Sequence, residues 1–237
     1  MFTTTNSKTF DRLSIVVYGE SGSGKTTLTK TLERPLLVSL ESGYLSLRDS
    51  EGIDVYDVTL DKDGHVLPMD LRFEKLLHGL KLLNTDEMKQ KYKWIVIDSL
   101  TEVAHALVFF LQKRYPDKRD ALVMWGEYNK MITELLKELR DFNPYNILIL
   151  ALNAVEKDES GRRFIGIDMP GKVSARVPAL FDECFNLVTF ETEDGDERKL
   201  ITSKHDNCIA KDRSGKLNKF EDADIGAIYN KIFKGEE

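Results

Sequence analysis

Four short runs of the chain are hydrophobic at almost every position. They read LSIVVY at 13–18, LLVSL at 36–40, WIVI at 94–97 and NILILAL at 146–152. A strand that is apolar on both sides is buried on both faces of its sheet, which is typical of parallel strands covered by helices. The pattern therefore predicts four buried parallel strands.

Segments with apolar residues at helical spacing lie between these runs. We expect helices from about residue 24 to before Pro35, and over 70–83, 100–115 and 121–140. Ser99 is a candidate N-cap for the third of them. Strands that alternate with helices predict an α/β fold with a mostly parallel sheet.

The pattern changes near residue 183. CFNLVTFET and RKLITSK flank Asp194-Gly195, a dipeptide typical of hairpin turns, and a short helix is expected near 222–233. The sequence thus predicts an antiparallel hairpin at the sheet edge. We expect residues 1–237 to form one domain, with 1–10 as a flexible or oligomer-docking tail.

Composition narrows the class of protein. The chain has 237 residues, a formal net charge of -6 and 41% hydrophobic residues, which suffices for a core. The acidic balance argues against coating nucleic acid by bulk charge, although a local basic groove stays open. The two cysteines, without metal spacing, are expected to be free thiols in a reducing cytoplasm. No apolar run approaches the length of a membrane span.

The segment GESGSGKT at 19–26 fits the pattern G-x-x-x-x-G-K-[ST] and lies between a predicted strand and a predicted helix. Its glycines allow backbone N–H groups to surround phosphate, and the start of the helix adds its dipole. We expect Lys25 to reach the β- and γ-phosphates of ATP and Thr26 to bind Mg²⁺. The predicted nucleotide-binding residues are Gly19, Glu20, Ser21, Gly22, Ser23, Gly24, Lys25, Thr26 and Thr27.

Three polar residues follow predicted strands, at the edge where ligands bind in open α/β sheets. Asp98, at the end of WIVID, is the expected Mg²⁺-side carboxylate, and Ser99 can cap the next helix as well. Glu41 can orient and activate the attacking water, or be an ordinary loop carboxylate. Asn153 likewise ends the fourth strand.

Two basic segments allow two interpretations each. The connection 154–177 carries five cations among four acids, so it is either a DNA-binding loop or a mixed-charge ribbon. Lys211 and Arg213 form a Lys-x-Arg turn that is either a solvated tip or part of an active site. The candidate DNA-binding residues are Lys157, Arg162, Arg163, Lys172 and Arg176.

In order, these pieces resemble the ATPase core of the RecA superfamily: the glycine-rich loop, SLESG, WIVIDSLTEV and ILILALN. The size is similar to that of compact phage-encoded RecA-like proteins. That AAA-type group comprises nucleotide-binding proteins and ATPases of single-strand annealing or recombination. The resemblance implies Mg²⁺ and ATP bound between subunits, Asp98 as the metal-side carboxylate, Glu41 as the base and Asn153 as a γ-phosphate sensor. It further implies that Lys211 and Arg213 reach the γ-phosphate of a neighbouring subunit.

The resemblance therefore predicts an ATPase that hydrolyses ATP at subunit interfaces, binds single-stranded DNA and acts in recombination or annealing. We expect it to self-associate into a ring or filament and to act in the cytoplasm, the host cytoplasm if phage-encoded. A compact hexameric helicase-like motor is one alternative. A nucleotide-switched protein that binds a partner without DNA contact is another, and the acidic charge favours it.

Overall fold

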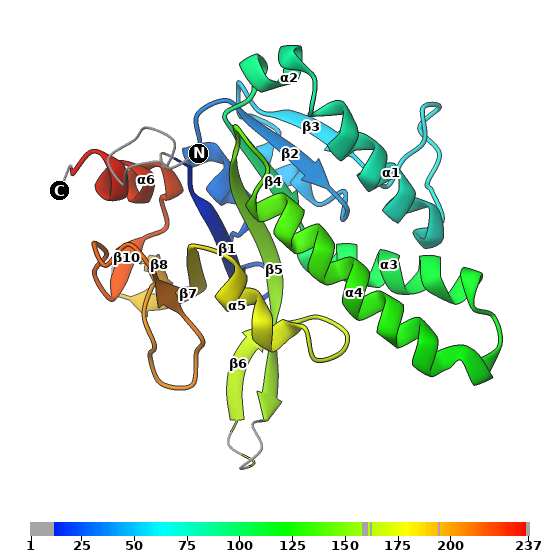
Figure 1. Cartoon of the computed structure of the whole chain (residues 1–237). Coiled ribbons are helices and arrows are strands. Elements are labelled where there is room, and N and C mark those ends of the chain that lie inside the picture. The colour runs from blue at the N-terminus through cyan, green and yellow to red at the C-terminus, as the bar shows by residue number, and fades with distance from the viewer. Residues whose placement is uncertain (1–11, 158–160, 162, 194, 236–237) are drawn as a thin grey trace, which may run out of the picture.

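The computed structural model describes residues 12–157, 161, 163–193 and 195–235. Within these residues a ten-stranded sheet runs through the middle of the molecule in the order β10-β8-β7-β1-β5-β4-β2-β3, with β6 paired to β5 and β9 to β7 (Figure 1). The strands are β1 Ser14–Gly19, β2 Pro35–Ser39, β3 Asp54–Asp57, β4 Trp94–Asp98, β5 Asn146–Lys157, β6 Arg163–Ile167, β7 Glu183–Thr192, β8 Gly195–Ile201, β9 Lys211–Asp212 and β10 Phe220–Asp222.

The pairing directions confirm the predicted α/β class. Strands β3, β2, β4, β5, β1 and β7 pair in parallel. Beyond β7 the sheet continues antiparallel through β8 and β10, and β7 and β8 form the predicted C-terminal hairpin. All four predicted buried strands are present, and three of them have bounds close to those of the apolar runs. The fourth, β5, continues to Lys157, so Asn153 lies within the strand and not at its end as predicted.

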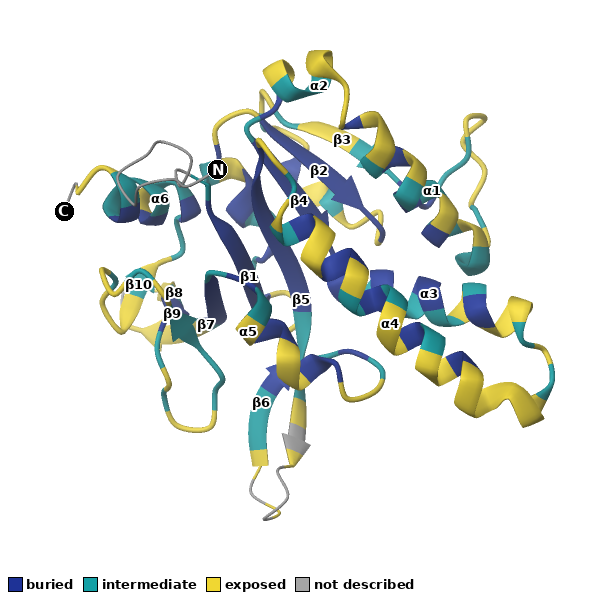
Figure 2. Cartoon of the chain, viewed as in Figure 1, coloured by how far each residue is buried: buried dark blue, intermediate teal, exposed yellow. Residues whose placement is uncertain are grey.

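Helices cover both faces of the sheet, as the doubly apolar strands predict. In β1, Val16 and Tyr18 pack in one core cluster with α1, α3 and α4, while Ile15 and Val17 pack in a second cluster with α6. Strands β1, β2 and β4 are accordingly buried along their length, and β5 is buried over residues 146–151 (Figure 2). The helices are α1 Met69–Leu82, α2 Asp86–Lys91, α3 Leu100–Arg114, α4 Ala121–Arg140, α5 Val177–Leu180 and α6 Ile225–Phe233. Short 3₁₀ helices span Thr26–Thr31, Tyr44–Leu47, Lys118–Asp120 and Ser174–Arg176.

One predicted helix is wrong in type and length. In place of an α-helix from about residue 24 to Pro35, the chain forms a 3₁₀ helix over Thr26–Thr31 only. Its sequence, TTLTKT, contains four threonines, whose branched side chains lose rotamer freedom in a helix. Two of their hydroxyls, on Thr27 and Thr31, donate instead to carbonyls three residues earlier.

The connection 154–177 is partly a β-ribbon. Strand β5 continues past the sheet and pairs antiparallel with β6 from Asn153↔Ile167 to Lys157↔Arg163. This hairpin projects away from the body of the molecule (Figure 1). The ribbon form that the mixed charges allowed is therefore what the structure has, and its DNA-binding role stays a prediction.

Among the described residues, no helix is both long enough and apolar enough to cross a membrane.

Candidate functional site

The glycine-rich loop begins where β1 ends, at Gly19, and leads into the 3₁₀ helix at Thr26. Gly22 and Gly24 have φ values of +80° and +92°, in the left-handed region that residues with a Cβ avoid. These two glycines therefore set the loop shape that turns backbone N–H groups toward one point.

Lys25 lies inside this loop and is 8% exposed. Its Nζ donates to the carbonyl oxygens of Gly19 at 3.0 Å and Glu20 at 2.7 Å. Burial lowers the pKa of Lys25, and the nearby carboxylates of Asp98, Glu41 and Glu20 oppose that shift.

The loop also fits a phosphate group. The Ser23 hydroxyl is buried and has no hydrogen-bond partner among the described residues. An unpaired buried hydroxyl is costly, and phosphate oxygens would accept a hydrogen bond from it while the Lys25 ammonium balances their charge. The donor set therefore matches the nucleotide phosphates predicted from the sequence.

Asp98 ends β4 beside the loop. The Thr26 hydroxyl donates to Asp98 Oδ2 at 2.6 Å, which brings together the two predicted metal-side groups. Burial raises the pKa of Asp98 to about 6, the Thr26 bond lowers it, and Glu41 and Lys25 act in opposite directions. A hydroxyl and a carboxylate at this separation are oxygen ligands of the kind that Mg²⁺ prefers.

Glu41 follows β2, the neighbour of β4 in the sheet. Its Oε1 accepts a hydrogen bond from the Ser99 hydroxyl, and its carboxylate otherwise lies at the surface. Ser99 also caps α3, because its Oγ accepts the Glu102 backbone N–H at 3.4 Å, as expected from the sequence. The ends of β1, β2 and β4 thus place Lys25, Glu41 and Asp98 in one group.

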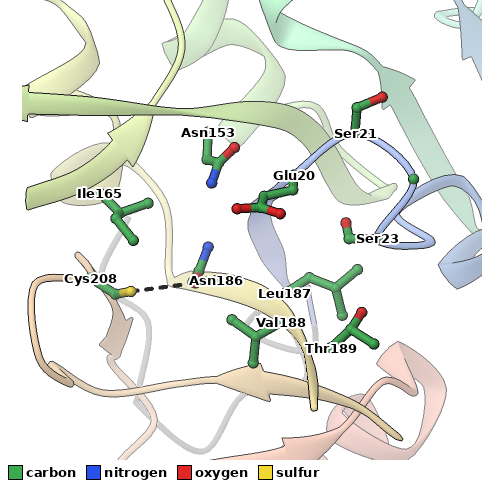
Figure 3. Close-up of a pocket in the computed structure, with 11 residues that line it drawn as sticks. Glu20, Ser21, Ser23, Asn153, Ile165, Asn186, Leu187, Val188, Thr189 and Cys208 are labelled. Carbon is green, nitrogen blue, oxygen red and sulfur yellow. Dashed lines mark hydrogen bonds between the residues drawn. The ribbon is translucent and has the colours of Figure 1, made fainter. Parts of the chain in front are cut away.

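A cavity of about 350 Å³ lies beside the loop, between Glu20–Ser23, Asn153 in the middle of β5, and strand β7. Figure 3 shows Glu20, Asn153 and Asn186 pointing toward one another across it. Asn186 Nδ2 donates to the Tyr18 carbonyl at 3.2 Å, and Cys208 Sγ donates to Asn186 Oδ1 at 3.4 Å. Asn153 therefore faces the loop across this cavity.

Sequence reasoning missed Asn186 and Arg198. Asn186 is one of several polar residues in the strand segment CFNLVTFET, and nothing in the local sequence distinguishes it from the others. Arg198 on β8 lies against the loop, where its Nη1 donates to Thr27 Oγ1 at 3.3 Å. An exposed arginine in a hairpin carries no local signal, because its contact with the loop depends on how the sheet is ordered.

The candidate DNA-binding cations lie on and beside the β5–β6 hairpin. Lys157 and Arg163 are a cross-strand pair near its tip, and both are exposed. Lys172 and Arg176 are exposed in the segment that follows β6. Arg162, like the tail 1–10, lies outside the described residues.

Lys211 and Arg213 have partners within their own chain. Strand β9, Lys211–Asp212, pairs with Glu183 and Cys184 of β7. Lys211 Nζ donates to the Pro178 carbonyl at 2.9 Å and also to that of Phe181.

Arg213 Nη1 forms an ion pair with Asp182 at 2.7 Å. We call Lys211 and Arg213 the finger residues, because the resemblance predicts that they reach the nucleotide of a neighbouring subunit. In the structure both point toward residues 178–182. To reach a neighbouring subunit they would have to exchange these bonds for new ones.

A family model described as an AAA domain, AAA_24, matches residues 11–214. No curated protein matches the sequence. Among solved structures, a KaiC-like protein from Pyrococcus horikoshii OT3 is 17% identical with a TM-score of 0.40, over 81% of this chain and 79% of that chain. An ATPase of the type III secretion system of pathogenic bacteria is 15% identical with a TM-score of 0.46, over 74% of this chain and 51% of that one.

Proposed function

Because this chain belongs to the AAA domain family, we propose that its glycine-rich loop binds ATP with Mg²⁺ and that the protein hydrolyses ATP to ADP and phosphate. The observation that carries this proposal is the grouping of Lys25, Thr26 and Asp98, with Thr26 and Asp98 joined at 2.6 Å. These are the cation, the hydroxyl and the carboxylate that phosphoryl transfer with Mg²⁺ requires.

Each residue then has a distinct task. The loop N–H groups and Lys25 hold the β- and γ-phosphates, so Nζ exchanges its two carbonyl acceptors for phosphate oxygens. Thr26 and Asp98 hold Mg²⁺, which neutralises charge on the phosphates. Asp98 is anionic above its pKa of about 6, the form that a metal ligand requires.

Glu41 is the proposed general base. It takes a proton from a water molecule as that water forms a bond to the γ-phosphorus and the bond from phosphorus to the β–γ bridging oxygen breaks. The Ser99 hydroxyl, which donates to Glu41 Oε1, orients the carboxylate for this task. Asn153 contacts the γ-phosphate and transmits its presence to the β5–β6 hairpin.

Glu41→Gln separates binding from turnover. Glutamine keeps the shape of glutamate and cannot take up the proton, so we expect parental ATP affinity and hydrolysis about 10²–10⁴-fold slower. Calorimetric titration with ATP and a phosphate-release assay measure the two quantities. Hydrolysis by Glu41→Gln at the parental rate would exclude Glu41 as the base.

We further propose that the protein assembles into a ring or filament and binds single-stranded DNA through the β5–β6 hairpin. Strand β5 runs unbroken from Asn153 to the exposed Lys157, so the two proposed sites lie on one continuous strand. Over four residues a strand extends about 13 Å, which lets the ribbon present its cations clear of the nucleotide. The exposed Val155 and partly buried Phe164 add apolar surface for bases.

Binding of a fluorescent oligonucleotide, with and without a non-hydrolysable ATP analogue, tests this role. Lys157→Ala with Arg163→Ala should weaken binding and flatten its dependence on salt, because fewer counterions are released. Lys62→Ala, an exposed lysine in the loop before α1, is the control. Equal salt slopes for parent and double variant would remove these residues from the phosphate contacts.

If the parent protein binds no DNA with or without nucleotide, the alternative of a nucleotide-switched protein that binds a partner is favoured. One observation supports that alternative. Phe109 of α3 and Leu122, Val123 and Trp125 of α4 expose 37–85% of their surfaces near the turn that joins the two helices, where an apolar partner could contact them. DNA unwinding driven by ATP would instead indicate a helicase-like motor.

A further inference from the structure

Arg198 covers part of the glycine-rich loop. A Cβ placed on Gly24 would lie 2.5 Å from Arg198 Nη1 and 2.7 Å from its Cζ, so the guanidinium fills the space directly over that glycine. The same Nη1 donates to Thr27 Oγ1, and the Thr27 hydroxyl in turn donates to the Gly24 carbonyl. Among the described residues no carboxylate forms an ion pair with Arg198. A cation is thus held against the loop by a residue that is itself exposed.

The position of Arg198 relates to the direction in which a bound nucleotide extends. Lys25 and Thr26 are directed toward β1 and β4, where Asp98 marks the metal end of the phosphate chain. Strand β8 lies on the other side of β1 in the sheet, two strands away through β7. If the γ-phosphate lies beside Asp98, the opposite end of the nucleotide, the nucleoside, lies toward Arg198.

A groove of about 380 Å³ adjoins the guanidinium and is lined by Gly22, Thr189, Asp196, Glu197 and Arg198. This volume falls within the range of small-molecule pockets. The two acidic residues disfavour a further phosphate, because like charges repel. They suit a neutral group that carries hydrogen-bond donors, such as sugar hydroxyls. Glu197 is already paired with Lys199 at 2.6 Å, which leaves Asp196 as the acceptor for such a donor.

We propose that this groove is the nucleoside subsite and that the Arg198 guanidinium stacks on the base. The inference rests on the proposed binding of ATP at the loop and adds residues from β7 and β8 to it. A guanidinium is planar and packs on aromatic faces, which a lysine ammonium cannot reproduce. Asp196 and Thr189 then contact the sugar.

Two probes separate this role from a phosphate contact. ATP carries the base and the phosphates, whereas inorganic tripolyphosphate carries the phosphates alone. We expect Arg198→Ala to weaken ATP binding about tenfold, the size of a typical base-stacking contact, and to leave tripolyphosphate binding unchanged. Arg198→Lys should resemble Arg198→Ala, because it keeps the charge and loses the planar group. Titration calorimetry measures the affinity of the parent and of both variants for each of the two probes.

The controls locate any failure. Lys25→Ala should abolish binding of both probes, and Arg119→Ala, which removes an exposed arginine between α3 and α4, should change neither. Circular dichroism and the unfolding temperature establish that each variant is folded.

Equal weakening of both probes by Arg198→Ala, with recovery in Arg198→Lys, would make Arg198 a phosphate ligand and overturn the proposal. Parental affinities for ATP in Arg198→Ala would overturn it as well, while leaving the loop's function intact. A parent protein that binds neither probe would overturn the proposed function and the subsite together.

Discussion

Replacing Lys211 by alanine should destabilise the fold even without nucleotide. The Lys211 ammonium donates to two backbone carbonyls, at 2.9 Å to Pro178 and also to Phe181, and it is partly buried. A hydrogen bond from a charged donor contributes about 1.5–3 kcal/mol to stability. Solvent reaches this site and can replace part of each bond, so we expect a loss of about 2–3 kcal/mol in the free energy of unfolding.

Arg213 should matter less. Its ion pair with Asp182 joins side chains that are 51% and 32% exposed. Exposed pairs contribute about 0–1 kcal/mol, so Arg213→Ala should lose less than Lys211→Ala.

Urea unfolding followed by circular dichroism, in buffer free of nucleotide, measures both losses. Lys62→Ala removes the same charged side chain from an exposed loop position, and it should unfold at the same urea concentration as the parent. If Lys211→Ala also unfolds at the parental urea concentration, the two hydrogen bonds to the carbonyls of Pro178 and Phe181 do not stabilise the fold.

The same residues test the predicted finger role between subunits. A protein with Lys211→Ala and Arg213→Ala has an intact glycine-rich loop and no finger residues. The Lys25→Ala protein has a defective glycine-rich loop and both finger residues. If the finger acts on a neighbour, each is inactive alone and a mixture regains part of the ATPase rate. A fully active finger variant would contradict the role. No recovery on mixing would restrict the turn to its own subunit.

Two further predictions concern stability. Glu183 is buried beside Asp212, and burial raises its pKa from 4.5 to about 8. The folded protein therefore binds an extra proton between these pH values, so stability is full below about 4.5 and falls as pH rises through 8, by a few kcal/mol. Urea unfolding at pH 5 and pH 8 should show a smaller loss in Glu183→Gln than in the parent, and equal losses would contradict the assignment. Gly24→Ala should cost about 1–2 kcal/mol, because alanine disfavours the φ of +92° there, while the Arg198 side chain moves away from the new Cβ. An unchanged unfolding temperature would show that the loop adopts another shape.

The sequence predicted the central strands well because their signal is local. Runs such as WIVI are apolar at every position, and both faces of β4 are in fact covered. The half-exposed edge strand β3, DVYD, has no such run and was missed. The length of the helix after the loop was overestimated, because the prediction considered the spacing of apolar residues and not the low helix propensity of the four threonines in TTLTKT.

The candidate site divides in the same way. Lys25, Thr26 and Asp98 stand in motifs whose context is one strand or one turn, and the structure brings them together. Arg198 and Asn186 join the loop through the order β8-β7-β1, which is set by pairing between strands more than 160 residues apart. No local pattern around either residue encodes that order.

Phosphate release from ATP, measured for the parent and for Lys25→Ala with and without Mg²⁺, decides whether the glycine-rich loop is an ATPase site. We expect release by the parent that requires Mg²⁺, and none by Lys25→Ala although that variant stays folded. Release at the same rate by both proteins, or no Mg²⁺-dependent release by the parent, would contradict the assignment of residues 19–26 and Asp98 as an ATP-hydrolysing site.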